Sequence, residues 1–345
     1  MLNDLSWAAA HNALASWDIQ AQDIEPLTLT ENIVFKITDG TKQSFVLRLH
    51  RPGYHNLNEL LSELQWTAAL LDAGLTVPVP RTTRDGRQYA SVYLGNQHRY
   101  AGLLEWVDGM PMENLIENNP DLTFVENSFS LLGEVMAKFH NQAVSWTIPL
   151  KFSRHSFDAD GLMGEAPFWG RFWESSALTP DQKTYIDTLR HNIYDLLIEL
   201  GKDPRTYSII HADLHPANIV VEGSRLHVID FDDSGFGWHH YDIAVALFNY
   251  DLDKPIEHLQ AAMITGYRKF RSISDNDLAY VQVFMLIRAM VCIGWYSARP
   301  EVTAGRIALP HLIDYVRSKA VRVMASHGIL IEPMRAFEIV TNRKS

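Results

Sequence analysis

The chain has 345 residues, of which 47% are hydrophobic and 21% are charged. This predicts a soluble folded protein with two lobes, or with one lobe that carries a large elaboration. A net charge of -11 excludes a protein that coats nucleic acid, because such a protein needs a basic face to neutralise phosphates. The single cysteine, Cys292, excludes a disulfide framework and favours a reducing compartment, so we expect a cytoplasmic protein.

The N-terminal part predicts a short helix followed by strands. Residues 5–17 carry apolar side chains at helical spacing. Further along the chain, the pattern predicts strands at 32–37 and 44–49 around an Asp-Gly turn, a helix at 57–73 that ends before a glycine, and strands at 89–94 and 99–107. The segment 108–111 (DGMP) then breaks the pattern. We therefore expect one lobe over residues 1–107 and a second over 108–345.

The second part is predicted to be mainly helical. Apolar periodicity of helix length occurs at 129–139, 180–200, 256–270, 276–298 and 310–327, and a strand-rich island lies at 208–231. The most apolar stretch, 280–296, contains Gln282 and Arg288, so we expect a buried helix and no membrane span. The whole pattern predicts an α+β chain in which a small strand-rich lobe precedes a larger helical lobe.

The most informative segments are 208–221 (SIIHADLHPANIVV) and 226–232 (LHVIDFD). Phosphoryl transfer needs a carboxylate that accepts the proton of the attacking hydroxyl, and amide and carboxylate oxygens that hold Mg²⁺ against the nucleotide phosphates. Asp213 suits the first role, and Asn218 and Asp230 suit the second. Each residue alone could cap a turn or end a strand. Their joint order, between apolar strands, favours the catalytic interpretation.

The pattern His211-x-Asp213-x-x-x-x-Asn218, followed by Asp230, resembles the aminoglycoside phosphotransferase and choline kinase family, which includes enzymes of the homoserine kinase type II kind. The resemblance is strongest over residues 205–247. It implies a bilobal protein-kinase-like fold that binds ATP and Mg²⁺. By this resemblance Asp213 would be the catalytic base, His211 would shape the catalytic loop, and Asn218 and Asp230 would bind Mg²⁺.

Two more acidic residues acquire roles from the same resemblance. Asp232 would add negative charge beside the metal, and it is also a candidate contact for the acceptor. Asp242 matches a family residue that braces the catalytic loop, so we expect a structural role for it.

The resemblance places the phosphate contacts in the first lobe. The turn at 30–32 (TEN), which ends in Asn32, lies where the family covers the phosphates, although it lacks glycines. Arg48 occupies the position of the family's phosphate-binding lysine, and Glu63 would pair with it. Arginine makes charge-assisted bonds to phosphate and bidentate carboxylate pairs, so this substitution alters the geometry but permits function. The alternative is an exposed strand arginine and a solvated glutamate.

Residues 103–107 (LLEWV) resemble the family hinge. There the backbone of Leu104, Glu105 and Trp106 would bind the adenine edge. The alternative is the edge of a buried strand.

Acceptor contacts are predicted from aromatic and acidic residues. Segments 168–173 and 234–241 are rich in aromatic side chains, which are more often core than ligand contacts. Trp238 and His239 are the candidates there, because glycines next to them predict a tight loop near the site. Acidic residues at 232, 233, 251 and 253 would suit an acceptor with an amine, and solvated surface is the alternative. Zinc is disfavoured because the histidines lack paired helical spacing.

The sequence thus predicts transfer of the γ-phosphate of ATP to a hydroxyl of a small molecule: an aminoglycoside, choline, homoserine or a sugar-like compound. Two alternatives stay open. One is a protein Ser/Thr kinase of the stress-response type, and the other is a nucleotide-binding pseudokinase, suggested by Arg48 and the glycine-poor turn. The sequence sets neither the acceptor nor the oligomeric state.

Overall fold

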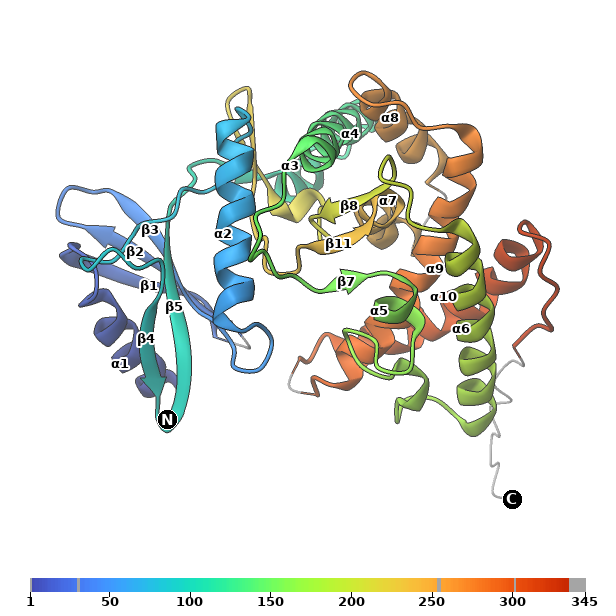
Figure 1. The fold of residues 1–345 in the computed structure, drawn as a ribbon, viewed down its shortest axis with the longest axis horizontal. Coiled ribbons are helices and arrows are strands. Elements are labelled where there is room, and N and C mark those ends of the chain that lie inside the picture. The colour runs from blue at the N-terminus through green and yellow to red at the C-terminus, as the bar shows by residue number, and fades with distance from the viewer. Residues whose placement is uncertain (1, 30–31, 253–255, 301, 335–345) are drawn as a thin grey trace.

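The computed structural model describes residues 2–29, 32–252, 256–300 and 302–334. A strand-rich part lies beside a larger helical part (Figure 1), which confirms the α+β architecture. The first part contains a five-stranded antiparallel sheet in the order β1-β2-β3-β5-β4. Its strands are β1 (Ala21–Leu29), β2 (Ile33–Asp39), β3 (Ser44–Leu49), β4 (Ala90–Leu94) and β5 (Gln97–Glu105).

Alternating side chains build the core of this sheet. Phe35, Phe45 and Leu47 point inward and are fully buried, as the period of two along a strand requires. Helix α1 (Leu2–Leu14) covers the sheet. Strand β1 was not predicted, because it is an edge strand with mostly exposed residues and an irregularity after Pro26.

Helix α2 (Leu57–Asp72) stands between the sheet and the helical part (Figure 1). A capping box between Asn56 and Glu59 starts it. Its Trp66 and Leu70 belong to the core of the helical part and not to the core of the sheet. This helix therefore ties the two parts together and fixes the position of Glu63 between them.

The helical part surrounds α9, the helix predicted to be buried. Val283 to Ile287 of α9 are fully buried. This helix is long and apolar enough to cross a membrane by composition alone, but most of it lies inside the protein. The helices are α3 (Met112–Asn118), α4 (Leu122–Ser145), α5 (Ala159–Met163), α6 (Pro180–Leu200), α7 (His239–Asp251), α8 (Glu257–Arg268), α9 (Asp275–Ser297) and α10 (Gly305–Ala325), with short 3₁₀ turns at Phe172–Glu174 and Pro216–Asn218.

Two small sheets carry the loops of interest. Their orders are β10-β9-β6 and β7-β11-β8. Gly109 lies at the predicted break, with a φ of +132°, and a Cβ there would stand 2.4 Å from the carbonyl oxygen of Val221, so only glycine fits. The strands are β6 (Met110–Pro111), β7 (Ser156–Phe157), β8 (Tyr207–Ile210), β9 (Ile219–Glu222), β10 (Arg225–Val228) and β11 (Gly235–Trp238).

Two predictions about elements change. The glycine-rich segment predicted as a loop forms strand β11, and α7 follows it directly. Pro310 lies inside α10 and does not begin it. The chain passes from the large sheet to β6 after Glu105, close to the predicted boundary. However, α2 precedes this point in the chain and still contributes Trp66 and Leu70 to the core of the helical part, so the division at 107/108 stays a prediction.

Candidate active site

The predicted catalytic loop connects β8 to β9. His211 is 1% exposed, and its Nε2 lies 3.0 Å from the carbonyl oxygen of Ile229, while the backbone N–H of Asp213 donates to its Nδ1 at 3.3 Å. Because a carbonyl only accepts, Nε2 carries the proton and Nδ1 is the acceptor. Burial lowers the pKa of His211, which fits this neutral form. His211 thus shapes the loop from within.

Asp242 braces the same loop, as expected. Its carboxylate accepts from the backbone N–H groups of His211 (3.1 Å) and Ala212 (2.7 Å) and contacts His140 Nε2 at 3.1 Å. Ala212 has a φ of +65°, a conformation that costs energy for a residue with a Cβ. The buried carboxylate holds the loop in this strained form.

Asp213 is surrounded by polar partners. Its Oδ1 lies 2.7 Å from Arg288 Nη2, and its Oδ2 lies 3.1 Å from Asn218 Nδ2 and 3.3 Å from His215 Nε2. Burial would raise the pKa of Asp213, but the hydrogen bond from His215 and the charge of Arg288 outweigh it and hold that pKa well below its usual range. Asp213 is therefore an ionised acceptor.

Arg48 and Asp230 meet across the two parts of the molecule. Arg48 Nη2 donates to Asp230 Oδ1 at 2.9 Å, and the Asp230 side chain remains 43% exposed. Asp230 has a φ of +65°, which turns its carboxylate out of the strand direction. The alternative of an exposed strand arginine is thereby excluded, since the Arg48 side chain is 14% exposed.

Asn218 and Asp230 fit a hard cation. Ile229 N–H donates to the backbone carbonyl of Asn218 at 3.0 Å, which brings the two candidate ligands side by side. The amide nitrogen of Asn218 is turned to Asp213, so its amide oxygen is left as a ligand. One amide oxygen and one exposed carboxylate match a magnesium ion that takes its other ligands from phosphates and water.

Asp232 faces the first lobe, which corrects its assignment as an acceptor contact. Asn32 Nδ2 donates to Asp232 Oδ2 at 2.8 Å, and Arg48 and His50 lie 3.9 and 3.6 Å from its Oδ1. The next residue, Asp233, instead accepts from Tyr54 and lines the cavity beside Asp213. Asn32 is thus held at the loop between β10 and β11, which carries Asp230 and Asp232 and is called the metal loop below. The rest of the predicted turn, residues 30 and 31, lies outside the described residues.

Glu63 does not pair with Arg48 among the described ion pairs. Its carboxylate lies 3.7 Å from Arg154, whose side chain is fully buried. Arg154 also donates to the backbone carbonyls of Asp232 and Ser234, both at 2.5 Å. The predicted pair of Glu63 and Arg48 is therefore replaced by a link from α2 through Arg154 to the metal loop. Arg48 pairs with Asp230 instead.

The hinge prediction is corrected for two amides. Glu105 N–H donates to Val79 O at 2.8 Å and Trp106 N–H donates to Ser44 O at 3.0 Å. Leu104 pairs with Val46 in the sheet. Because the backbone of Leu104 is already engaged with Val46, an adenine contact in this segment would use the carbonyl group of Glu105 or Trp106.

Trp238 and His239 belong to the core, which corrects their assignment as acceptor contacts. They are 1% and 2% exposed. Trp238 Nε1 donates to Gly201 O at 2.8 Å, and His239 stacks on His140 with ring centres 4.0 Å apart. Asp251 accepts hydrogen bonds from Tyr315 and Lys319 and does not line the cavity beside Asp213. Residue 253 lies outside the described residues.

A cavity of ≈ 570 Å³ opens beside Asp213. Burial and the charges of Asp213 and Asp232 raise the pKa of Asp233, which also lines it, to about 7. Tyr54 OH donates to Asp233, and Trp169 Nε1 donates to Tyr54 OH at 3.2 Å. The described lining residues are Trp169, Asp213, His215, Asp233, Phe248, Asn249, Leu252, Arg288, Val291, Cys292, Trp295, Tyr296, Ile307, Ala308, His311 and Leu312.

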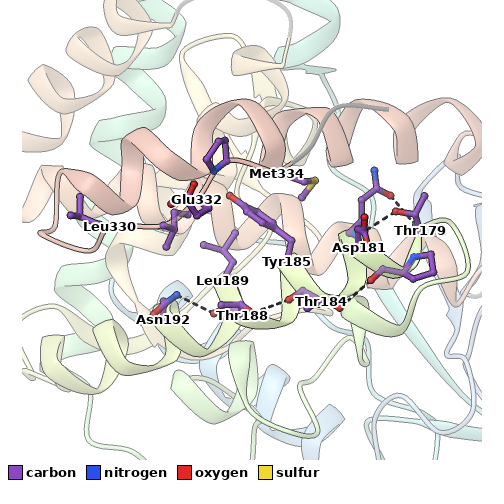
Figure 2. A pocket seen from close by; sticks show the side chains of 14 residues that line it. Thr179, Asp181, Thr184, Tyr185, Thr188, Leu189, Asn192, Leu330, Glu332 and Met334 are labelled. Carbon is purple, nitrogen blue, oxygen red and sulfur yellow. Dashed lines mark hydrogen bonds between the residues drawn. The ribbon is translucent and has the colours of Figure 1, made fainter. Parts of the chain in front are cut away.

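A larger cavity of ≈ 850 Å³ lies between α6 and residues 330–334 (Figure 2). None of the predicted site residues lines its described part. The hydroxyls of Thr184 and Thr188 and the amide of Asn192 donate to backbone carbonyls of their own helix. Because these polar groups are satisfied locally and do not converge, the smaller cavity is the better candidate for catalysis.

A sequence model described as the phosphotransferase enzyme family matches residues 23–273. The chain belongs to this family. Its fold is similar to that of a microcompartment-associated aminopropanol kinase, with a TM-score of 0.80 and 31% identity over 94% of this chain and 99% of that chain. An amicoumacin kinase solved with AMP-PNP, Ca²⁺ and Ami has a TM-score of 0.76 and 19% identity, over 91% and 93%. A homoserine kinase of Sinorhizobium fredii is 23% identical over 274 residues, 76% of each chain.

The protein-kinase-like fold and the enzyme class are therefore confirmed. This phosphotransferase is an ATP-dependent enzyme that acts on a hydroxyl group of a small molecule. The comparisons favour this activity over a protein kinase or a pseudokinase.

Four side chains of the site were not predicted: Tyr54, Arg154, His215 and Arg288. For Arg288 the sequence held a signal, because a single charge within an apolar helix is rarely buried without a partner.

Proposed function

We propose that this phosphotransferase is a cytoplasmic kinase for a small amino alcohol. The cavity beside Asp213 carries the proposal, because it brings the Asp233 carboxyl and the Trp169 ring together within ≈ 570 Å³. A carboxylate beside an aromatic face attracts an ammonium group, and a cavity of this size suits a small molecule. The likeness to an aminopropanol kinase supports the same class of acceptor.

Each residue of the candidate active site then has a role. Asp213 receives the proton of the acceptor hydroxyl, and His211 holds its loop. Asn218 and Asp230 would hold Mg²⁺, which would offset the negative charge of the phosphates. Arg48 would bind phosphate oxygens, since it already lies 2.9 Å from Asp230.

A second candidate acceptor is a hydroxy amino acid. Arg288 in the same cavity favours it, because a guanidinium pairs well with a carboxylate. The homoserine kinase relative supports this class. The two candidates differ only in whether the acceptor carries an anionic group in addition to its amine.

The test is a screen of ATP consumption across acceptors. We would compare aminopropanol, ethanolamine, choline, homoserine, a neutral sugar and an aminoglycoside. We expect an amino alcohol to give the highest kcat/KM, and Asp213→Asn to lower kcat roughly 100- to 10,000-fold, as loss of a general base does. A neutral sugar as the best substrate would overturn the proposal.

A pair of variants checks the ammonium contact. Asp233→Asn should raise the KM of an amine acceptor roughly tenfold, the effect of losing one charged hydrogen bond, and leave the KM of ATP unchanged. Asp203→Asn is the matched control, because Asp203 pairs with Arg205 on the surface. An unchanged acceptor KM in Asp233→Asn would exclude Asp233 from acceptor binding.

A further inference from the structure

Arg288 is a cation inside the acceptor cavity, in the middle of core helix α9. Its Nη2 lies 2.7 Å from Asp213 Oδ1, its Nη1 lies 3.4 Å from Tyr241 OH, and its guanidinium carbon lies 5.7 Å from the centre of the Trp169 ring. Among the described residues that line the cavity, it is the one arginine or lysine. Its side chain is 17% exposed, so it borders the cavity instead of lying in the sealed core.

The contacts of Asp213 fix where an acceptor hydroxyl can bind. Oδ2 contacts Asn218 and His215, whereas Oδ1 accepts a hydrogen bond from Arg288. A carboxylate oxygen has room for two donors, so the hydroxyl would share Oδ1 with the guanidinium. With both hydrogen bonds near 2.7 Å, the attacking oxygen lies within about 5 Å of the guanidinium. The phosphorus that bonds to this oxygen lies at most one P–O bond length farther away, a distance that the long arginine side chain can cover.

We propose that Arg288 is a catalytic residue that binds the oxygens of the phosphoryl group during transfer. This inference rests on the proposed role of Asp213, but it applies to any hydroxyl acceptor. In the structure the guanidinium rests on Asp213. During transfer it turns from Oδ1 to the phosphoryl oxygens, a movement that the long side chain allows while α9 stays fixed.

The step balances in atoms and charge. The acceptor oxygen forms a bond to the γ-phosphorus, and the bond from that phosphorus to the β–γ bridging oxygen breaks, with its electron pair, to release ADP. The hydroxyl proton passes to Asp213 and then to solvent. Negative charge is spread over the equatorial phosphoryl oxygens in such a transfer, and a guanidinium placed beside them stabilises it.

The first test separates catalysis from binding. Arg288→Lys and Arg288→Met should lower kcat roughly 100- to 1,000-fold, the size found when one donor to a developing charge is lost, with the KM of ATP nearly unchanged. Added guanidinium should restore part of the activity of Arg288→Ala. If kcat is kept and the acceptor KM rises instead, the proposal is overturned and Arg288 is an acceptor-binding residue.

The second test needs no acceptor. Fluoroaluminate with ADP and Mg²⁺ mimics the planar phosphoryl group, so it should bind the wild-type enzyme and tighten ADP binding, and Arg288→Met should lose this gain while its affinity for ADP alone stays the same. An equal gain in both proteins would contradict the proposal. This readout stands even if every amino alcohol fails as a substrate, which separates the two proposals.

Arg190→Met is the matched control. Arg190 is also buried in the helical part, where it donates to Met163 O at 2.7 Å. It should lose stability but keep kcat and the fluoroaluminate effect. A loss of both in Arg190→Met would mean that removal of any buried guanidinium disturbs the site, and would overturn the assignment.

Discussion

Arg48 Nη2 lies 2.9 Å from Asp230 Oδ1, so the arginine of β3 directly contacts the candidate metal ligand. Burial would lower the pKa of Arg48, but the charges of Asp230 and Asp232 outweigh it and raise that pKa. The guanidinium is therefore a permanent charge. It lies within reach of any phosphate that a cation holds at Asp230.

Replacing Arg48 should weaken nucleotide binding. We expect Arg48→Met to raise the KM of ATP roughly 10- to 100-fold, which corresponds to the loss of one or two hydrogen bonds to a charged group. Isothermal titration of ADP would measure the same loss without catalysis. Arg87→Met is the control, because Arg87 pairs with Asp85 on the surface, and it should change the KM less than twofold. An Arg48→Met enzyme with wild-type affinity for ADP would exclude the phosphate role.

The candidate catalytic and metal-binding residues could be predicted from the sequence, because they lie in two short segments of the chain. His211, Asp213 and Asn218 lie within one loop, and the structure brings Asp230 beside them through the adjacent strand pair of β9 and β10. Asp242 could be predicted for a similar reason. In contrast, the partner of Glu63 depends on Arg154, which is distant in sequence and lies in a segment without periodicity.

The Glu63 partner can be tested by double-mutant cycles. Since Glu63 lies 3.7 Å from Arg154, Glu63→Gln and Arg154→Met should couple by at least about 1 kcal/mol in the free energy of unfolding, whereas Glu63→Gln and Arg48→Met should couple by less than about 0.5 kcal/mol. Urea unfolding of the single and double variants gives both values. Stronger coupling to Arg48 would restore the pair expected from the sequence.

The acceptor side was harder to predict, because aromatic side chains look alike in sequence whether they line a cavity or fill a core. Trp238 and Trp169 illustrate this. Trp238 is buried against Phe284 of α9, and its Nε1–H donates to the carbonyl oxygen of Gly201. Trp169 instead lines the cavity. Only the three-dimensional path of the chain separates them.

These two tryptophans give a direct comparison. Trp238→Phe should destabilise the protein by about 1 kcal/mol, through the lost hydrogen bond, and leave the acceptor KM unchanged. Trp169→Phe should raise the acceptor KM, because the variant loses the hydrogen bond to Tyr54 and presents a smaller ring to the acceptor in the cavity. Thermal melting and steady-state kinetics on both variants would measure this. A raised acceptor KM in Trp238→Phe would return this residue to the acceptor site.

Asp233 predicts a dependence of stability on pH. Burial, then the charges of Asp213 and Asp232, raise its pKa from 3.8 to about 7, so between these values the folded protein holds a proton that the unfolded chain has released. Stability therefore falls as pH rises through this range, by at most about 1.4 kcal/mol for each pH unit. Above pH 7 the carboxylate is charged beside Asp213 in the folded protein, and the loss is complete.

Asp233→Asn should remove this dependence, because its amide does not titrate and its oxygen can still accept from Tyr54. The variant should melt close to the wild type at pH 5 and at a higher temperature than the wild type at pH 8. Asp203→Asn serves as the control, since the hydrogen bond from Arg205 lowers the pKa of Asp203 to about 2, outside this range. If the gap between wild type and Asp233→Asn is the same at pH 5 and pH 8, then Asp233 is ionised throughout, and an ammonium group would meet a carboxylate whose charge does not depend on pH.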